Sequence, residues 1–208
     1  MIHGVTTETV SKKLFTVDEF HRMWDAGILP ESGRFELIRG EIIEMPPPGS
    51  PHASRVKRLI RLFTSRLGES VIVSVQDPFV IGLYSEPFPD VALLRPRDDF
   101  YEAAHPGPGD VLLVVEVSHY SASYDRNIKA PLYAEAGVPE YWQVDVLKES
   151  VTVRTDPKAN KYQTVRILRR GETIESPQLQ GVTFSVDDIL GAKQPPATSS
   201  LPKQTDEG

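Results

Sequence analysis

Two acidic residues within strongly apolar segments are the first candidates for chemistry. Asp90 opens the segment "DVALL", and Glu116 interrupts the apolar run "DVLLVVEVS". Side chains alternate along a strand, so Glu116 shares one strand face with Val114 and Ser118. Burying a carboxylate is costly unless it is paired or bound to a cation. If the two strands pair, we expect both carboxylates near one edge of the sheet.

Two carboxylates that converge without a cation repel each other, and a divalent cation removes this repulsion. Mg²⁺ (or Mn²⁺) prefers oxygen ligands and fills its other positions with water and phosphate oxygens. Such an ion activates water for attack on a phosphodiester, and a nearby lysine orients that water. The alternative is a structural ion pair, in which Asp90 is a turn residue and Glu116 pairs with Arg126 or Lys129. Spacing alone leaves both interpretations open.

The order of the predicted helices and strands indicates which elements hold Asp90 and Glu116 in place. Residues 15–27 predict a helix with a capping box from Thr16, and residues 34–45 predict a hairpin that turns at Arg39 and Gly40. Apolar residues at helical spacing predict a second helix over 52–68. Strands follow, then a helix over 124–137, then a strand meander. A helix between strands suggests a βαβ crossover in a mixed sheet, so we expect an α/β or α+β fold.

Composition limits the class of protein. The chain has 208 residues, a net charge of -6 and no cysteine. This acidic balance argues against a protein that coats nucleic acid through bulk charge, but it leaves a nuclease open. We expect a cytoplasmic protein, because no secretory signal or membrane-spanning window is apparent. We expect a flexible segment over 1–13, one domain over 14–190, and a disordered tail over 191–208.

The second predicted helix carries a basic face. Its cationic residues are Arg55, Lys57, Arg58, Arg61 and Arg66. The simpler interpretation of these clustered charges is a solvated helix surface. The more specific interpretation is a face that contacts phosphates.

Several segments resemble one family in their order along the chain. They are "FELIRGEIIEMPPPGSPH", "EPFPDVALLRP", "LLVVEVS", "YDRNIKAPLYAEAGVPEYW" and "VD", within residues 14 to 190. Together they resemble the Uma2 family of restriction-endonuclease-like proteins, part of the PD-(D/E)XK nuclease superfamily. The resemblance implies a restriction-endonuclease-like core, in which a mixed sheet is flanked by helices.

The resemblance also implies roles for particular residues. Asp90 and Glu116 match the metal-binding acids of a Mg²⁺-dependent phosphodiesterase. Ser118 occupies the usual position of the motif lysine, and the family pattern points to Lys129 on the following helix instead. Glu36 matches a glutamate in the early hairpin and is the candidate third acid, with Glu41 as a weaker candidate.

Other positions have two interpretations each. His52, at the start of the basic helix, either contacts phosphate and shapes the site or makes only a local hydrogen bond. Gln76 lies in a stretch that resembles the family and either approaches the site or, as the favoured interpretation, faces solvent from a strand. We expect Asp125 to serve as a helix-start residue. Core packing is expected for Tyr133, Tyr141 and Trp142. His119 and Tyr120 depart from the family pattern beside the proposed site.

The sequence therefore predicts a Mg²⁺-dependent endonuclease that acts on DNA. In this prediction His52, Arg55, Lys57, Arg58 and Arg61 contact the nucleic acid. The alternatives are an inactive nuclease-fold binding module and a phosphodiesterase that acts on RNA. A homodimer is expected only because relatives with this fold often cut as dimers.

Overall fold

A six-stranded mixed sheet forms the centre of the protein. The computed structural model describes residues 10–179 and 181–193, so the predictions for 1–13 and 191–208 fall largely outside the described residues. The strand order is β3-β4-β5-β6-β7-β8. The strands are β3 (Ile72–Ser74), β4 (Val91–Leu94), β5 (Val111–Ser118), β6 (Glu140–Asp145), β7 (Ser150–Lys158) and β8 (Lys161–Arg169). Only β5 and β6 pair in parallel, and the other neighbours are antiparallel.

The parallel pair is connected by the expected helical crossover. It consists of α3 (Ala122–Tyr124), the π-helical turn η3 (Asp125–Lys129) and α4 (Ala130–Glu135). Pro131 lacks an N–H, so it cannot make the usual helical bond to the preceding turn. Directly before Pro131, the N–H of Ala130 donates to the carbonyl of Asp125, five residues earlier, which is the spacing of a π-helical turn. The crossover therefore continues past Pro131, with Lys129 at the end of a widened turn.

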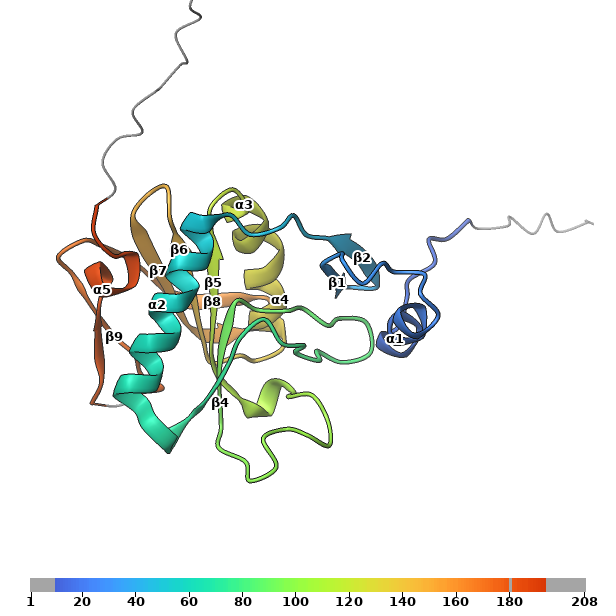
Figure 1. The fold of residues 1–208 in the computed structure, drawn as a ribbon, viewed down its shortest axis with the longest axis horizontal. Helices are drawn as coiled ribbons and strands as arrows, with labels where there is room; N and C mark the ends of the chain where they lie inside the picture. The colour runs from blue at the N-terminus through green and yellow to red at the C-terminus, as the bar shows by residue number, and fades with distance from the viewer. Residues whose placement is uncertain (1–9, 180, 194–208) are drawn as a thin grey trace, which may run out of the picture.

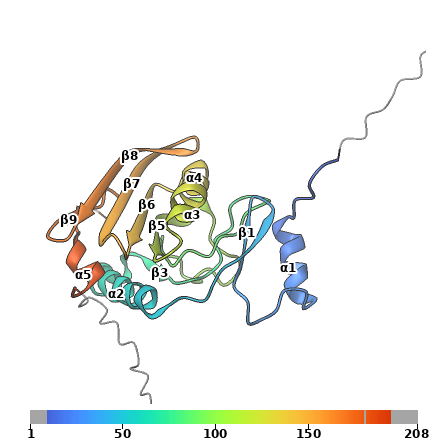
Figure 2. The same cartoon turned by 90° about the horizontal axis from the view of Figure 1, so that it is seen from above.

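Helices cover both faces of the sheet, as Figures 1 and 2 show. One face packs against α2 (Ser50–Leu67) and α5 (Val186–Leu190). The other face packs against α4. Strand β5 contributes to both layers, because Val115 belongs to the core under α2 and Val114 to the core under α4. This alternation confirms the predicted faces of the strand and places Glu116 on the α4 side.

The N-terminal part forms a small layer beside the sheet (Figure 2). It contains α1 (Val17–Asp25), β1 (Phe35–Ile38) and β2 (Glu41–Glu44). The predicted capping box is present, since Thr16 and Glu19 each accept a backbone N–H of the other. The hairpin turns at Arg39 and Gly40, both with positive φ, which suits a two-residue hairpin turn.

The remaining elements are short. They are η1 (Gly68–Ser70), η2 (Pro108–Asp110), β9 (Thr173–Glu175) and β10 (Thr183–Ser185). Strands β9 and β10 form a separate antiparallel pair, and Phe184 of β10 packs against Phe63 of α2. Within the described residues, no helix combines the length and apolar character needed to cross a membrane. The mixed sheet flanked by helices, with an N-terminal helix and hairpin, confirms the predicted fold class.

Candidate active site

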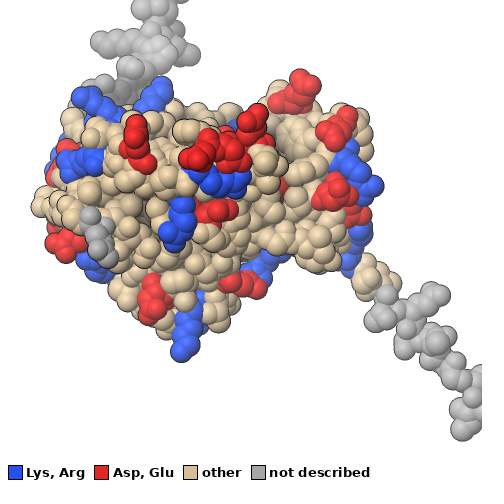
Figure 3. All heavy atoms as spheres, turned by 90° about the horizontal axis from the view of Figure 1, so that it is seen from below, with Lys and Arg blue, Asp and Glu red and all other residues tan. Residues whose placement is uncertain are grey.

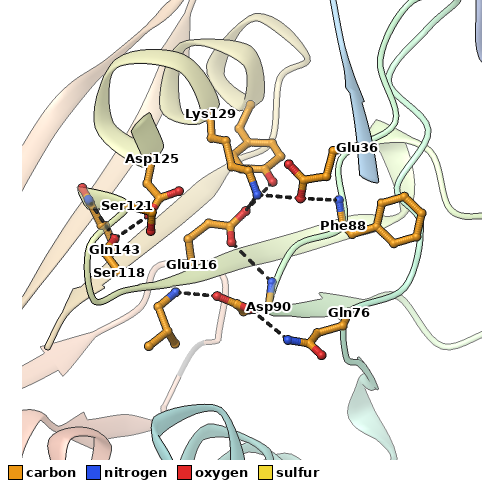
Figure 4. Close-up of polar contacts among 12 residues, drawn as sticks. Glu36, Gln76, Phe88, Asp90, Glu116, Ser118, Ser121, Asp125, Lys129 and Gln143 are labelled. Carbon is orange, nitrogen blue, oxygen red and sulfur yellow. Dashed lines mark hydrogen bonds and ion pairs between the residues drawn. The ribbon is translucent and has the colours of Figure 1, made fainter. Parts of the chain in front are cut away.

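The two predicted acids lie side by side, Asp90 directly before β4 and Glu116 within β5. The antiparallel register pairs Val91 with Val115. Asp90, one residue before Val91, therefore lies opposite Glu116, one residue after Val115. The N–H of Asp90 donates to Glu116 Oε2 at 3.4 Å, and the N–H of Val117 donates to Asp90 Oδ2 at 2.9 Å. Both carboxylates are buried, and Figure 4 shows them facing the same space. The predicted convergence of the two strands is thus observed.

Two side chains from outside the sheet hold Asp90. His52 Nε2, from the first turn of α2, lies 2.8 Å from Asp90 Oδ2. Gln76 Nε2 donates to Asp90 Oδ1 at 3.2 Å. Of the two interpretations of Gln76, the approach to the site is the one observed, and the favoured solvent-facing position is wrong; its backbone adopts a φ of 56°. Such backbone strain in a non-glycine residue is common at functional sites.

Lys129 lies between two carboxylates. Its Nζ is 2.8 Å from Glu36 Oε1 and 2.9 Å from Glu116 Oε1, and only 2% of the residue is exposed. The hydroxyl of Tyr133 also donates to Glu116 Oε1 at 2.7 Å. The π-helical turn therefore delivers Lys129 to Glu116, whereas Ser118, the usual lysine position, is buried nearby and donates to Asp125 at 2.6 Å.

Acidic groups outnumber cationic groups in this cluster. One cation, Lys129, faces the carboxyl groups of Glu36, Asp90, Glu116 and Asp125 (Figure 4). Burial raises the pKa of Glu116 to about 8, against the opposing charge of Lys129. Burial lowers the pKa of Lys129, but the negative charges of Glu116 and Glu36 outweigh it and raise that pKa.

Asp90 behaves differently from Glu116. Although burial opposes it, the pKa of Asp90 is lowered by the hydrogen bonds from His52 and Val117 and by nearby positive charge. The pKa values of the two neighbouring acids are therefore displaced in opposite directions, because their hydrogen bonds and charged partners differ.

The acids open into a hollow of about 450 Å³ that is also lined by Glu36, His52 and Lys129. Within the described residues, no three His, Cys, Asp or Glu side chains form a ready-made metal cluster. Two carboxylates, with water and substrate oxygens in the remaining positions, nevertheless suit Mg²⁺. Glu36 Oε2 is buried without a hydrogen-bond partner, which leaves a further unneutralised oxygen beside them. The donors and the surplus negative charge fit a divalent cation.

The predicted basic face divides into two parts. Arg55 is 6% exposed and donates to the carbonyl of Pro51, so it is not part of the exposed surface. Arg55 therefore does not contribute to the exposed face of α2, and it lines a separate hollow beside Glu149 instead. Lys57, Arg58 and Arg61 are exposed, but they line a different hollow between α2 and α5. The structure does not bring these three residues to the acid pair.

Several other residues differ from their predicted roles. Glu41 is exposed on β2 and pairs with Lys12, away from the site. Asp125 is more than a helix-start residue, because its carboxylate is buried and accepts from Ser118 and Ser121. Tyr133 is buried as expected, but its hydroxyl contacts Glu116.

The sequence contains a spacing signal for three of the residues around Glu116. Asp125, Lys129 and Tyr133 recur every four residues, which places them on one side of the crossover. That pattern could have indicated that Asp125 and Tyr133 face the same strand as Lys129.

The mixed sheet flanked by helices, with a buried acid–lysine cluster at one edge, is a nuclease-like fold. The chain belongs to the Uma2 family, described as "Putative restriction endonuclease", whose model matches residues 17–187. A similar solved structure is a protein from Anabaena variabilis ATCC 29413, described as a putative nuclease belonging to DUF820. It is 18% identical, with a TM-score of 0.64 over 85% of this chain and 97% of the other. No curated protein matches the chain.

Proposed function

We propose that this protein is a Mg²⁺-dependent endonuclease that hydrolyses phosphodiester bonds in DNA. The observation that carries the proposal is the meeting of Asp90, Glu116 and Lys129 around one hollow. Asp90 and Glu116 would hold the ion, with Mn²⁺ as an alternative. When bound, the ion would lower the pKa of a water molecule and offset charge on the phosphate.

Lys129 supplies the fixed positive charge of the site. Its raised pKa keeps the ammonium protonated, so it acts as a hydrogen-bond donor rather than as a base. Two of its three N–H groups point to Glu36 and Glu116, which leaves one for the attacking water or a phosphate oxygen. This arrangement stabilises the negative charge that develops as water attacks phosphorus and the ester oxygen leaves.

Glu36 and His52 complete the arrangement from two sides. Glu36 orients Lys129, and its own Oε1 accepts the N–H of Phe88 at 3.1 Å. His52 orients Asp90 and lines the hollow, so a phosphate contact is compatible with its position. Both residues therefore position the groups that would meet the substrate.

Binding of DNA must rely on local contacts. Figure 3 shows Lys and Arg mixed with Asp and Glu on one face of the molecule, rather than gathered into one broad basic surface. The exposed Lys57, Arg58 and Arg61 offer phosphate contacts on α2, outside the catalytic hollow. We expect these contacts to contribute to affinity and to weaken with salt.

The test is cleavage of supercoiled plasmid and of single-stranded DNA in Mg²⁺, Mn²⁺ or EDTA. We expect nicking by the wild-type protein with metal, and none with Asp90→Asn or Glu116→Gln. The exposed Glu102→Gln serves as the control, because Glu102 lies outside the hollow and its loss should leave cleavage unchanged. Equal cleavage by all four proteins would refute the assignment, and absence of cleavage by every one would favour a non-catalytic binding module.

A further inference from the structure

An exposed aromatic side chain stands at the mouth of the catalytic hollow. Tyr120, just after β5, is 86% exposed and lines the same hollow as Asp90 and Glu116. Its ring centroid lies 4.1 Å from that of His119, at an interplanar angle of 48°. The hydrolytic arrangement described above does not use either ring. An open aromatic face beside reacting groups can stack on a planar group of the substrate.

A second hollow adjoins the first. It has a volume of about 470 Å³, and it shares Pro51 and His119 with the catalytic hollow. Arg55 lines it, and Arg55 Nε is buried without a hydrogen-bond partner. Among the described residues, Arg55 forms no ion pair, and its one hydrogen bond reaches the carbonyl of Pro51 at 3.3 Å. A buried, unpaired guanidinium favours an anionic ligand.

The surroundings of Arg55 also favour an anionic ligand, because they disfavour the positive charge of its guanidinium. Burial lowers its pKa, and so do the neighbouring charges of Arg58 and Arg170. Glu149 also lines the second hollow, but Arg170 binds its carboxylate at 2.7 Å. Glu149 thus acts on Arg55 only through its charge, which partly offsets the lowering of the Arg55 pKa, and it forms no ion pair with Arg55. Phosphate is the anion that a nucleic acid would bring to such a position.

We propose that the two hollows form one binding track for single-stranded DNA. A base next to the scissile phosphate stacks on Tyr120, and the flanking phosphate binds Arg55, with His119 between them. In a duplex, each base is covered on both faces by its neighbours, so Tyr120 favours an unpaired strand. The inference rests on the proposed nuclease function, which places the scissile phosphate at Asp90 and Glu116.

The stacking contact is tested by fluorescence anisotropy with labelled oligothymidine, in EDTA so that no cleavage occurs. A stacked base contributes about 1–3 kcal/mol, so Tyr120→Ala should weaken binding about 5- to 150-fold. Tyr120→Phe keeps the ring and should retain wild-type affinity. The control is Tyr84→Ala, since Tyr84 is a partly exposed tyrosine that lines a different hollow. A duplex of mixed sequence should bind more weakly and be indifferent to Tyr120.

The phosphate contact is tested through salt dependence. Removal of one phosphate contact on a single strand should reduce the slope of log K against log salt by about 0.7. We expect this reduction for Arg55→Met and not for Arg55→Lys, with thermal melting used to confirm that both variants fold. Unchanged single-strand affinity in Tyr120→Ala, or an unchanged slope in Arg55→Met, would overturn the proposal.

The outcome separates this inference from the proposed function. Plasmid cleavage together with Tyr120-independent binding refutes the binding track and leaves the nuclease assignment standing. Tyr120-dependent binding by a protein that never cleaves refutes the nuclease assignment and supports the binding track.

Discussion

Lys129 and Glu36 are 93 residues apart in the chain, yet Lys129 Nζ lies 2.8 Å from Glu36 Oε1 inside the protein. This ion pair connects the N-terminal hairpin to the helical crossover. Because Lys129 also contacts Glu116, it links both segments to strand β5. The same residue is therefore expected to matter for stability as well as for catalysis.

Removal of the Lys129 charge should destabilise the protein. Lys129→Met leaves Glu36 and Glu116 buried without their cation, so we expect the free energy of unfolding to fall by about 3–5 kcal/mol. Denaturant unfolding measures this loss. Addition of Glu36→Gln to the variant should restore part of the stability, because one uncompensated carboxylate is removed.

An exposed lysine provides the control for that experiment. Lys148 is largely exposed beside Asp145, so Lys148→Met should change the free energy of unfolding by no more than about 0.5 kcal/mol. Equal losses in Lys129→Met and Lys148→Met would show that the buried pair does not stabilise the fold.

Substitutions of Gln76 should affect stability and activity differently, because its backbone is strained. A left-handed conformation costs a non-glycine residue about 1–2 kcal/mol, so Gln76→Gly should be more stable than Gln76→Ala by about 1 kcal/mol. Both variants lose the hydrogen bond to Asp90, so both should cleave more slowly than the wild type. Thermal melting and plasmid nicking measure the two effects. Full activity in both variants would show that Gln76 does not position Asp90.

Phe63 should be a principal contributor to the core under α2. Its ring lies 5.9 Å from that of Trp142 and 5.3 Å from that of Phe184, so it joins α2 to β6 and β10. Phe63→Ala should lower the free energy of unfolding by about 3–5 kcal/mol because it leaves a cavity. Leu147→Ala is the control, since Leu147 is 62% exposed. A similar small loss in both variants would contradict this account of the core.

Glu140 should give the protein a specific pH dependence. Burial raises its pKa, against hydrogen bonds from Ser176 and Trp142. The folded state thus holds the proton more tightly than the unfolded state, so the contribution of Glu140 to stability is lost as pH rises from the ordinary glutamate range through the raised pKa. Glu140→Gln removes this titration. The stability of Glu140→Gln relative to the wild type should therefore increase over that pH range, as followed by denaturant unfolding, and a constant difference would contradict the prediction.

Much of the fold was predictable because local signals agree with tertiary packing. The capping box of Thr16, the turn at Arg39 and Gly40, and the apolar stripe of α2 all specify local structure. The alternation around Glu116 also predicted which residues of β5 share its face of the sheet. Such features depend on residues close together in the sequence, which is why pattern analysis detects them.

The supporting contacts of the site were less predictable. The bond from Gln76 to Asp90 depends on a positive φ in a residue whose type does not require one. Burial of Arg55 depends on how the start of α2 packs beside the connection between β6 and β7, which a helical pattern cannot reveal. The widened turn before Pro131 interrupts the helix predicted over 124–137, and helical spacing alone does not indicate it. Each of these features arises from tertiary context that overrides local preference.

The central claim is that Asp90 and Glu116 together form a divalent-cation site, and calorimetric titration with Mn²⁺ tests it most directly. The account predicts saturable binding by the wild-type protein and by the control Glu102→Gln, and its loss in Asp90→Asn and in Glu116→Gln. Absence of binding by the wild-type protein, or unaltered binding by both acid-pair variants, would contradict the claim.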